Sequence, residues 1–174
     1  MGVLADRLNT MTVRVCSPDD TVRLYLTGGG QLHLEFARGS LLEHTESSLS
    51  KQLSHVCTMA VRRRRQGMAT AVREAIADMD SDEDDTFTRQ PPPTRAAPSE
   101  PPITALGRSP RSLVTVRRIP GAIFDIKVRK GTLARFNAEQ VIAEFHEAFN
   151  AAATDYKRQA AALRKSGAAR GSAP

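Results

Sequence analysis

Aromatic residues and cysteines are scarce in this sequence, and tryptophan is absent. Aromatics make up 5% of the 174 residues, so one large core that uses the whole chain is not expected. The two cysteines, Cys16 and Cys57, stand far apart without a CxxC pattern, which excludes a zinc site or disulfide framework of their own and suits a reducing compartment. No stretch approaches the roughly 18 apolar residues of a membrane span, and no signal peptide is visible. The sequence therefore disfavours a secreted scaffold, a membrane protein and a large enzyme, and predicts a cytoplasmic protein.

Charge is distributed unevenly along the chain. Its 25 Lys and Arg against 19 Asp and Glu give a net charge of +6. Residues 1–77 carry +3, residues 78–100 carry −5 and residues 101–174 carry +8. The acidic stretch is followed by a Pro-rich one and lacks the apolar content that offsets the entropy of ordering, which predicts a flexible linker. Two basic modules on either side of an acidic linker indicate an anionic partner.

An internal repeat is the most informative feature of the sequence. A shift of 92 residues places Ser17-Pro18 on Ser109-Pro110 without a gap, together with several glycines. Apolar positions of the strand and helix periods recur in the same columns: Leu24, Leu32, Leu34 and Phe36 on Val116, Phe124, Ile126 and Val128, and Leu49, Leu53, Val56 and Cys57 on Val141, Phe145, Ala148 and Phe149. The pattern indicates that one unit has been duplicated.

Each copy predicts a β-hairpin followed by a long helix. Alternating apolar residues on both sides of a Gly-containing turn predict the hairpin, and Thr45 and Asn137 are the expected helix N-caps. The helices are expected over 47–77 and 138–165. A third strand is predicted before the first hairpin, whereas the matching TALGRSPR of the second copy reads as a poor strand. The expected fold is α+β, with two antiparallel meander-plus-helix units at 11–78 and 111–166, a disordered linker at 79–110 and a disordered tail at 167–174.

The order of elements resembles the YbaB/EbfC family of small nucleoid-associated proteins. The residues behind the resemblance are SPDDTVRLYLTGGGQLHLEF with the helix LSKQLSHVCTMAVRRRRQGM, and a more diverged second copy. The family's members are homodimers of one unit with an additional N-terminal helix, and many bind DNA with little sequence preference. The resemblance implies a YbaB-like pseudo-dimer within this chain, or a homodimer, located in the nucleoid. This chain has two units, and its first ten residues are too few for a full N-terminal helix.

The strongest local signal for function is a run of four arginines, residues 62–65. At 100° per residue, Arg62 and Arg65 lie clear of the apolar stripe, Arg63 lies at its edge, and Arg64 lies within it and must extend its charged end outward. Four adjacent guanidinium groups favour a counter-anion, for which phosphate is the natural candidate. The alternative is an ordinary solvated helix surface.

Basic residues recur in the same columns of both helices. If the helices lie side by side, they form one surface suited to sequence-tolerant DNA binding. The predicted DNA-binding residues are Arg62, Arg63, Arg65, Arg73, Lys157, Arg158, Arg164 and Lys165. A second basic cluster on the sheet consists of Arg117, Arg118, Lys127, Arg129 and Lys130. Strand alternation places three of them, Arg117, Lys127 and Arg129, on the face opposite the apolar residues, and a solvent-facing polar face is the simpler interpretation.

Catalysis finds little support in the sequence. No motif places His, Cys or carboxylates at metal-binding or nucleophile spacing, and Gly28-Gly29-Gly30 reads as a hairpin turn rather than a phosphate loop. Cys57 is expected to be a small buried hydrophobe. The sequence therefore predicts a DNA-binding protein that is not an enzyme and has no cofactor or metal. The alternative is a protein–protein adaptor, associated with type VII secretion, that docks a partner without binding DNA.

Overall fold

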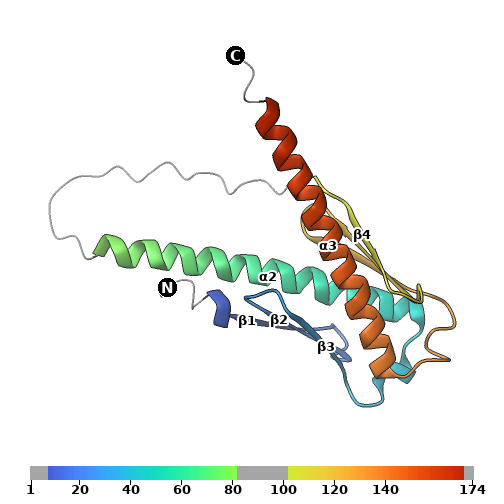
Figure 1. The fold of residues 1–174 in the computed structure, drawn as a ribbon. Helices are drawn as coiled ribbons and strands as arrows, with labels where there is room; N and C mark the ends of the chain where they lie inside the picture. Colours follow the sequence, from blue (N-terminus) through green and yellow to red (C-terminus); the bar gives the residue numbers. More distant parts are fainter. Residues whose placement is uncertain (1–7, 82–101, 171–174) are drawn as a thin grey trace.

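The computed structural model describes residues 8–81 and 102–170, which form an α+β fold with two sheets and two long helices (Figure 1). The first half contains β1 (Thr12–Cys16), β2 (Val22–Thr27), β3 (Leu32–Phe36), a short 3₁₀ turn η1 (Ser40–Glu43) and α2 (Glu46–Ser81). The second half contains β4 (Ala105–Arg108), β5 (Val114–Ile119), β6 (Ile123–Val128) and α3 (Ala138–Arg170). Each half is therefore a three-stranded antiparallel meander, in the orders β1-β2-β3 and β4-β5-β6, followed by one helix.

The duplication extends to individual hydrogen bonds. The Ser17 hydroxyl accepts the N–H of Val22 at 2.9 Å, and 92 residues later the Ser109 hydroxyl accepts the N–H of Val114 at 3.1 Å. Asp20 and Ser112, at the same place in the two turns, both have a positive φ. Core packing constrains the conformation of such turns only weakly, so this agreement indicates that the two halves are copies of one unit.

Both helix N-termini are capped as predicted. The Thr45 hydroxyl accepts the N–H of Ser48, and the Ser48 hydroxyl accepts the N–H of Thr45, at 3.1 and 3.0 Å. Asn137 and Gln140 make the same reciprocal pair at 2.9 and 3.1 Å. These capping boxes satisfy backbone donors that the first helical turn leaves without a partner. The starts of the helices are confirmed, and both helices extend four to five residues past the predicted ends.

The predicted boundaries of the second unit were wrong at both ends. Residues read as a poor strand form β4, so the unit begins before residue 111, and α3 continues beyond residue 166. Gly107 in this segment is needed for packing, because a Cβ there would lie 2.0 Å from the carbonyl oxygen of Ala148 in α3. The predicted linker, 79–110, is wrong at its ends, since α2 continues to Ser81 and β4 begins at Ala105. Its residues 82–101, and residues 171–174 of the predicted tail 167–174, lie outside the described residues.

The two units share one hydrophobic core. The predicted apolar stripe of α2 is buried throughout, from Leu49 to Ala60. It packs in one cluster with residues of both sheets and of α3, among them Leu24, Val116 and Phe145, each 0% exposed. Neither meander alone can bury the apolar surface of both its sheet and its helix. Packing of the two units against each other buries the apolar surface of both.

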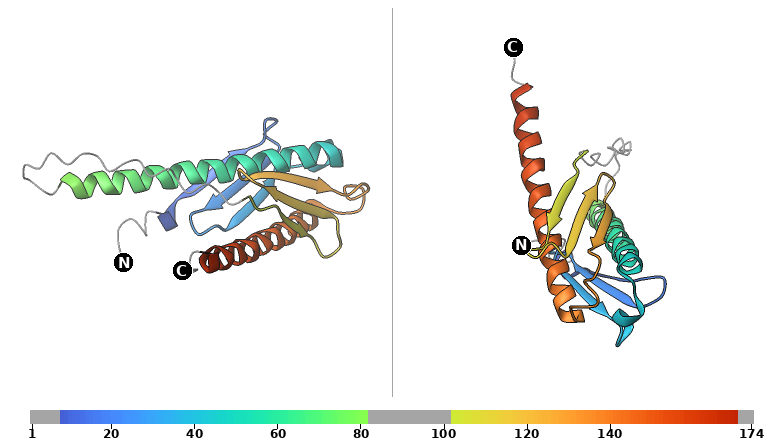
Figure 2. Two further views of the ribbon diagram at one scale, coloured as in Figure 1. Left: turned by 90° about the horizontal axis from the view of Figure 1, so that it is seen from above. Right: turned by 90° about the vertical axis from the view of Figure 1, so that its right-hand side faces the viewer.

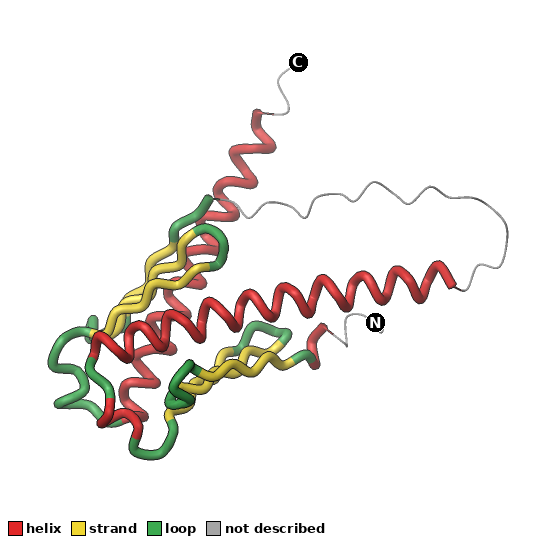
Figure 3. Tube along the Cα trace, turned by 180° about the vertical axis from the view of Figure 1, so that it is seen from behind, coloured by secondary structure: helices red, strands yellow, loops and turns green. Residues whose placement is uncertain are grey.

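The helix of the first unit seals the edge of the second sheet. α2 runs between the two sheets (Figure 3), and hydroxyls one turn apart on it accept the outward N–H groups of β6. The bonds are Ser50 to Val128 at 2.9 Å, Ser54 to Ile126 at 2.8 Å and Thr58 to Phe124 at 3.0 Å. An otherwise unpaired strand edge is thereby satisfied by side chains of a helix.

The two helices do not lie side by side, contrary to the arrangement on which a single basic surface was expected. Their N-terminal ends approach each other, and their C-terminal ends point in different directions (Figures 1 and 2). The physical reason is that α2 packs along β6, so that the sheet of the second unit stands between much of α2 and α3.

Replacing Ser54 by alanine removes one acceptor and leaves the Ile126 N–H without its partner. We expect Ser54→Ala to lower the free energy of unfolding by about 1–3 kcal/mol, measured by urea denaturation. Ser47, exposed on the same helix, is the matched control. Equal stability of Ser54→Ala and Ser47→Ala would show that the bonds from the α2 hydroxyls to the N–H groups of β6 do not hold the units together.

Candidate anion-binding site between the two units

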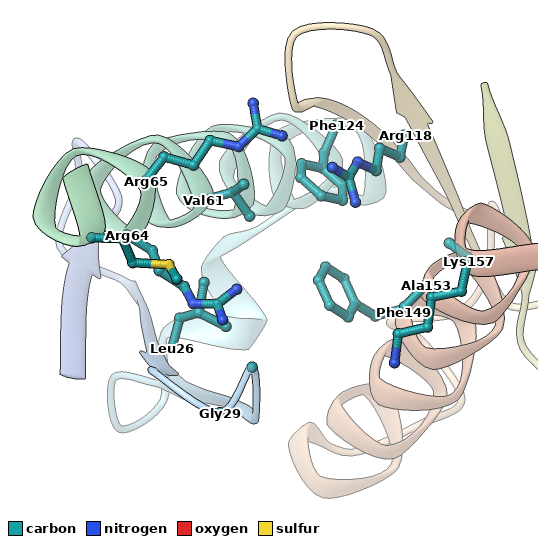
Figure 4. A pocket seen from close by; sticks show the side chains of 13 residues that line it. Leu26, Gly29, Val61, Arg64, Arg65, Arg118, Phe124, Phe149, Ala153 and Lys157 are labelled. Atoms are coloured by element: carbon teal, nitrogen blue, oxygen red, sulfur yellow. The ribbon is translucent and has the colours of Figure 1, made fainter. Parts of the chain in front are cut away.

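Four cationic side chains gather around a pocket of about 460 Å³ at the junction of the units (Figure 4). Arg64 and Arg65 come from α2, Arg118 from β5 and Lys157 from α3. None of the described residues that line this pocket is acidic. The remaining lining residues are Leu26, Gly29, Gly30, Val61, Met68, Phe124, Phe149, Ala152 and Ala153.

Equivalent positions of the two units face each other across the pocket. Arg65 and Lys157 occupy the same column of the repeat, 92 residues apart, as do Val61 and Ala153. Both units thus contribute a cation and a small apolar side chain from the middle of their long helices. The site exists only because the two copies are packed together.

Arg64 extends from the apolar side of α2 as predicted. Its side chain is half-buried, and its Nη2 donates to the carbonyl oxygen of Gly28 at 2.5 Å. Its Nε is buried and has no hydrogen-bond partner. The β2–β3 connection is a turn, as expected, with Gly30 at φ 86°. It nevertheless lines the pocket, because the bond between Arg64 and the Gly28 carbonyl holds Gly29 and Gly30 at its wall.

Arg118 is a cation of this pocket that the sequence analysis placed in the basic cluster of the sheet and not among the predicted DNA-binding residues. It lies on the same face of β5 as buried Val116, pointing inward, with its guanidinium 3.7 Å from the ring centroid of Tyr156. A cation over an aromatic face is stabilised electrostatically and held in place. The available signal was the strand alternation itself, which places Arg118 on the apolar register of the strand.

The apolar part of the pocket is built on two stacked phenylalanines. The rings of Phe124 and Phe149 lie 5.6 Å apart between centroids and are inclined by 21°. Phe149 also contacts the buried ring of Phe145, at 6.0 Å. The pocket therefore combines an aromatic wall with a cationic rim.

The predicted DNA-binding residues divide into three groups. Arg65 and Lys157 meet at the pocket. Arg63 instead donates to the carbonyl oxygen of Arg14 at the edge of β1, and Arg158 pairs with Asp155 at 2.6 Å. The others are exposed along the helices: Arg62 and Arg73 on α2, and Arg164 and Lys165 on α3. The sheet cluster is partly neutralised, because Arg117 pairs with Asp125.

The described residues that line this pocket include no His, Cys, Asp or Glu. Within residues 8–81 and 102–170, no three His, Cys, Asp or Glu side chains are placed to hold a metal ion. Cys57 is 1% exposed, and burial raises the pKa of its thiol well above its ordinary value. An inert thiol in the core fits the predicted role of Cys57 as a small hydrophobe.

The two thiols should differ in reactivity. Cys16 is half-buried, whereas Cys57 is enclosed. We expect a thiol reagent such as dithionitrobenzoate to modify one cysteine in the native protein and both in urea. Rapid modification of Cys57 in the native state, located by peptide mapping, would contradict the packing of α2.

The described part of the chain has no helix long and apolar enough to cross a membrane. Comparison with protein-family models, curated proteins and solved structures finds no match to this chain.

Proposed function

We propose that this protein binds DNA through its backbone phosphates, with little preference for sequence. The observation that carries the proposal is the convergence of Arg65 and Lys157, one from each unit, beside Arg64 and Arg118 and without an acidic lining residue. Arginine presents a planar fork of donors that matches a phosphate, and lysine adds a compact charge. Phosphate contacts of this kind supply affinity without reading bases.

The diverging helices extend the cationic surface beyond the pocket. Arg62 and Arg73 continue it along α2, and Arg164 and Lys165 along α3, on exposed positions of helices that point away from each other (Figure 1). A polyanion seated at the pocket would meet further cations in two directions. A small mononucleotide would use only the pocket, so the exposed cations favour a polymer.

The arrangement also supports the proposal that the chain is a relative of the YbaB/EbfC family. Two meander-plus-helix units that pack within one chain take the place of a homodimer of single-unit proteins. In this proposal the protein acts in the cytoplasm on nucleoid DNA and needs no cofactor.

Salt dependence tests the proposal. Fluorescence anisotropy with two short labelled duplexes of unrelated sequence should give equal affinities. Four phosphate contacts predict that log K falls against log salt with a slope of about −3.6. Absence of binding at low salt, or a slope near zero, would contradict DNA binding through phosphates.

A second candidate, docking of a protein segment, has one specific observation in its favour. By the 92-residue repeat, the outward N–H groups of β3 correspond to those of β6 that the α2 hydroxyls accept. At the matching positions α3 carries Ile142, His146 and Asn150 instead, and the Nε2 of His146 is buried without a hydrogen-bond partner. An extended segment could add to this edge. An adaptor of this kind would tolerate charge reversal at Arg62 and Arg65, whereas DNA binding would not.

A further inference from the structure

We propose that the pocket takes one unpaired nucleotide, with the base against the aromatic wall and the phosphate on the cationic rim. The inference rests on the proposed binding of nucleic acid and goes beyond it, because it predicts a preference for single-stranded over duplex DNA. The observation that supports this inference is the apolar and aromatic lining of the pocket, which a duplex bound through its phosphates would not contact.

Apolar side chains face each other across the pocket. Phe149 of α3 projects from one wall with Lys157 on the same side, and Leu26 and Val61 stand on the opposite wall with Arg65 (Figure 4). A duplex presents only phosphates and sugars to a surface of this kind and would leave the apolar walls unfilled. An unstacked base offers a flat apolar face, and stacking on aromatic side chains is how single strands are held without sequence preference.

Arg64 holds the β2–β3 turn at the wall of the pocket. Its Nη2 donates to the Gly28 carbonyl oxygen at 2.5 Å, and Gly29 and Gly30 line the pocket beside it. The two Nη atoms of an arginine carry four N–H groups, and those not bound to Gly28 are donors for a base carbonyl or ring nitrogen. Bases of all four kinds carry such an acceptor, so the contact gives affinity rather than selectivity.

The cations are placed for the phosphate of the same nucleotide. Arg118 is held over Tyr156, while Arg65 and Lys157 reach the rim from opposite helices. The volume of about 460 Å³ lies within the range of roughly 300–1,000 Å³ typical of small-ligand pockets. The chemistry recognised is a nucleoside 5′-phosphate, which either a single strand or a free nucleotide can supply.

The test measures binding of the full chain to four probes: a single-stranded oligonucleotide, the duplex of the same length, adenosine 5′-monophosphate and inorganic phosphate. We expect the single strand to bind about tenfold more tightly than the duplex at equal salt. Adenosine monophosphate should compete with the single strand at concentrations where inorganic phosphate does not.

Two variants place the effect in the pocket. Ala153→Leu fills the space from α3 and keeps every cation, whereas Phe149→Leu removes the aromatic ring. Both should lower the affinity for the single strand about tenfold, to that of the wild-type protein for the duplex, because stacking contributes only to the binding of an unpaired base. Ala153→Leu retains the phenylalanine stack, so the test stands even if Phe149→Leu fails to fold.

The outcomes separate this inference from the proposed function. Equal binding of single strand and duplex, unchanged in Ala153→Leu, would overturn the pocket assignment while DNA binding stands. Binding of adenosine monophosphate alone would support the pocket and overturn the polymer as its source. Equal competition by inorganic phosphate would overturn the role of the base, and no binding of any probe would overturn both proposals.

Discussion

Reversing the charges of Arg65 and Lys157 together should weaken duplex binding at least about a hundredfold at low salt. Hydrogen bonds to charged groups contribute about 1.5–3 kcal/mol each, and the variant Arg65→Glu/Lys157→Glu replaces two of them with repulsion. The loss of two phosphate contacts should also reduce the salt slope from about −3.6 to about −1.8. Anisotropy titrations at several salt concentrations measure both quantities.

A matched double variant separates the site from net charge. Arg38 and Arg135 are exposed, lie in the loops that follow β3 and β6, and do not line the pocket between the units. Arg38→Glu/Arg135→Glu changes the net charge by the same amount and should retain most of the affinity. If both double variants lose affinity equally, the pocket has no special part in binding.

Replacing Gly107 by alanine should destabilise the protein by at least about 3 kcal/mol, because even one methyl group meets backbone that cannot yield. The added Cβ would lie 2.0 Å from the Ala148 carbonyl oxygen and 2.3 Å from the Ala152 nitrogen, both in α3. β4 and α3 would have to separate, opening the core around Phe145. Urea denaturation followed by circular dichroism gives the change in the free energy of unfolding.

Gly29→Ala is the control for this substitution. A Cβ at Gly29 meets nothing closer than the Thr27 hydroxyl at 3.9 Å, so its effect on stability should be within about 0.5 kcal/mol. Wild-type stability in Gly107→Ala would mean that β4 does not pack against α3 as described.

The repeat made much of the fold predictable. Because the apolar columns of both copies follow strand and helix periods, the hairpins, the capped helix starts and the buried stripe from Leu49 to Ala60 could all be predicted from residue types. Hydrogen bonds between neighbouring residues determine the helix starts, as at Thr45 and Asn137. Short sequence patterns are therefore enough to predict them.

Long-range packing accounts for what could not be predicted. The segment TALGRSPR reads as a poor strand because no local pattern shows that α3 packs against Gly107. No local pattern shows either that the hydroxyls of Ser50 and Ser54 accept N–H groups of β6. The same holds for the site. Strand alternation placed Arg118 on the inner face of β5, but only the packing of the two units shows that Arg65 and Lys157 join it there.

The central claim is that cations from both units form one site for nucleic acid. The most direct test is a nuclear magnetic resonance titration of the ¹⁵N-labelled full chain with a short duplex, followed through backbone amides and arginine Nε–H signals. The account predicts that shifts gather on 61–68 of α2, on 152–158 of α3 and on Arg118 at the same DNA concentration. Shifts confined to one helix, shifts centred on β3 and His146, or no shifts at all would contradict it.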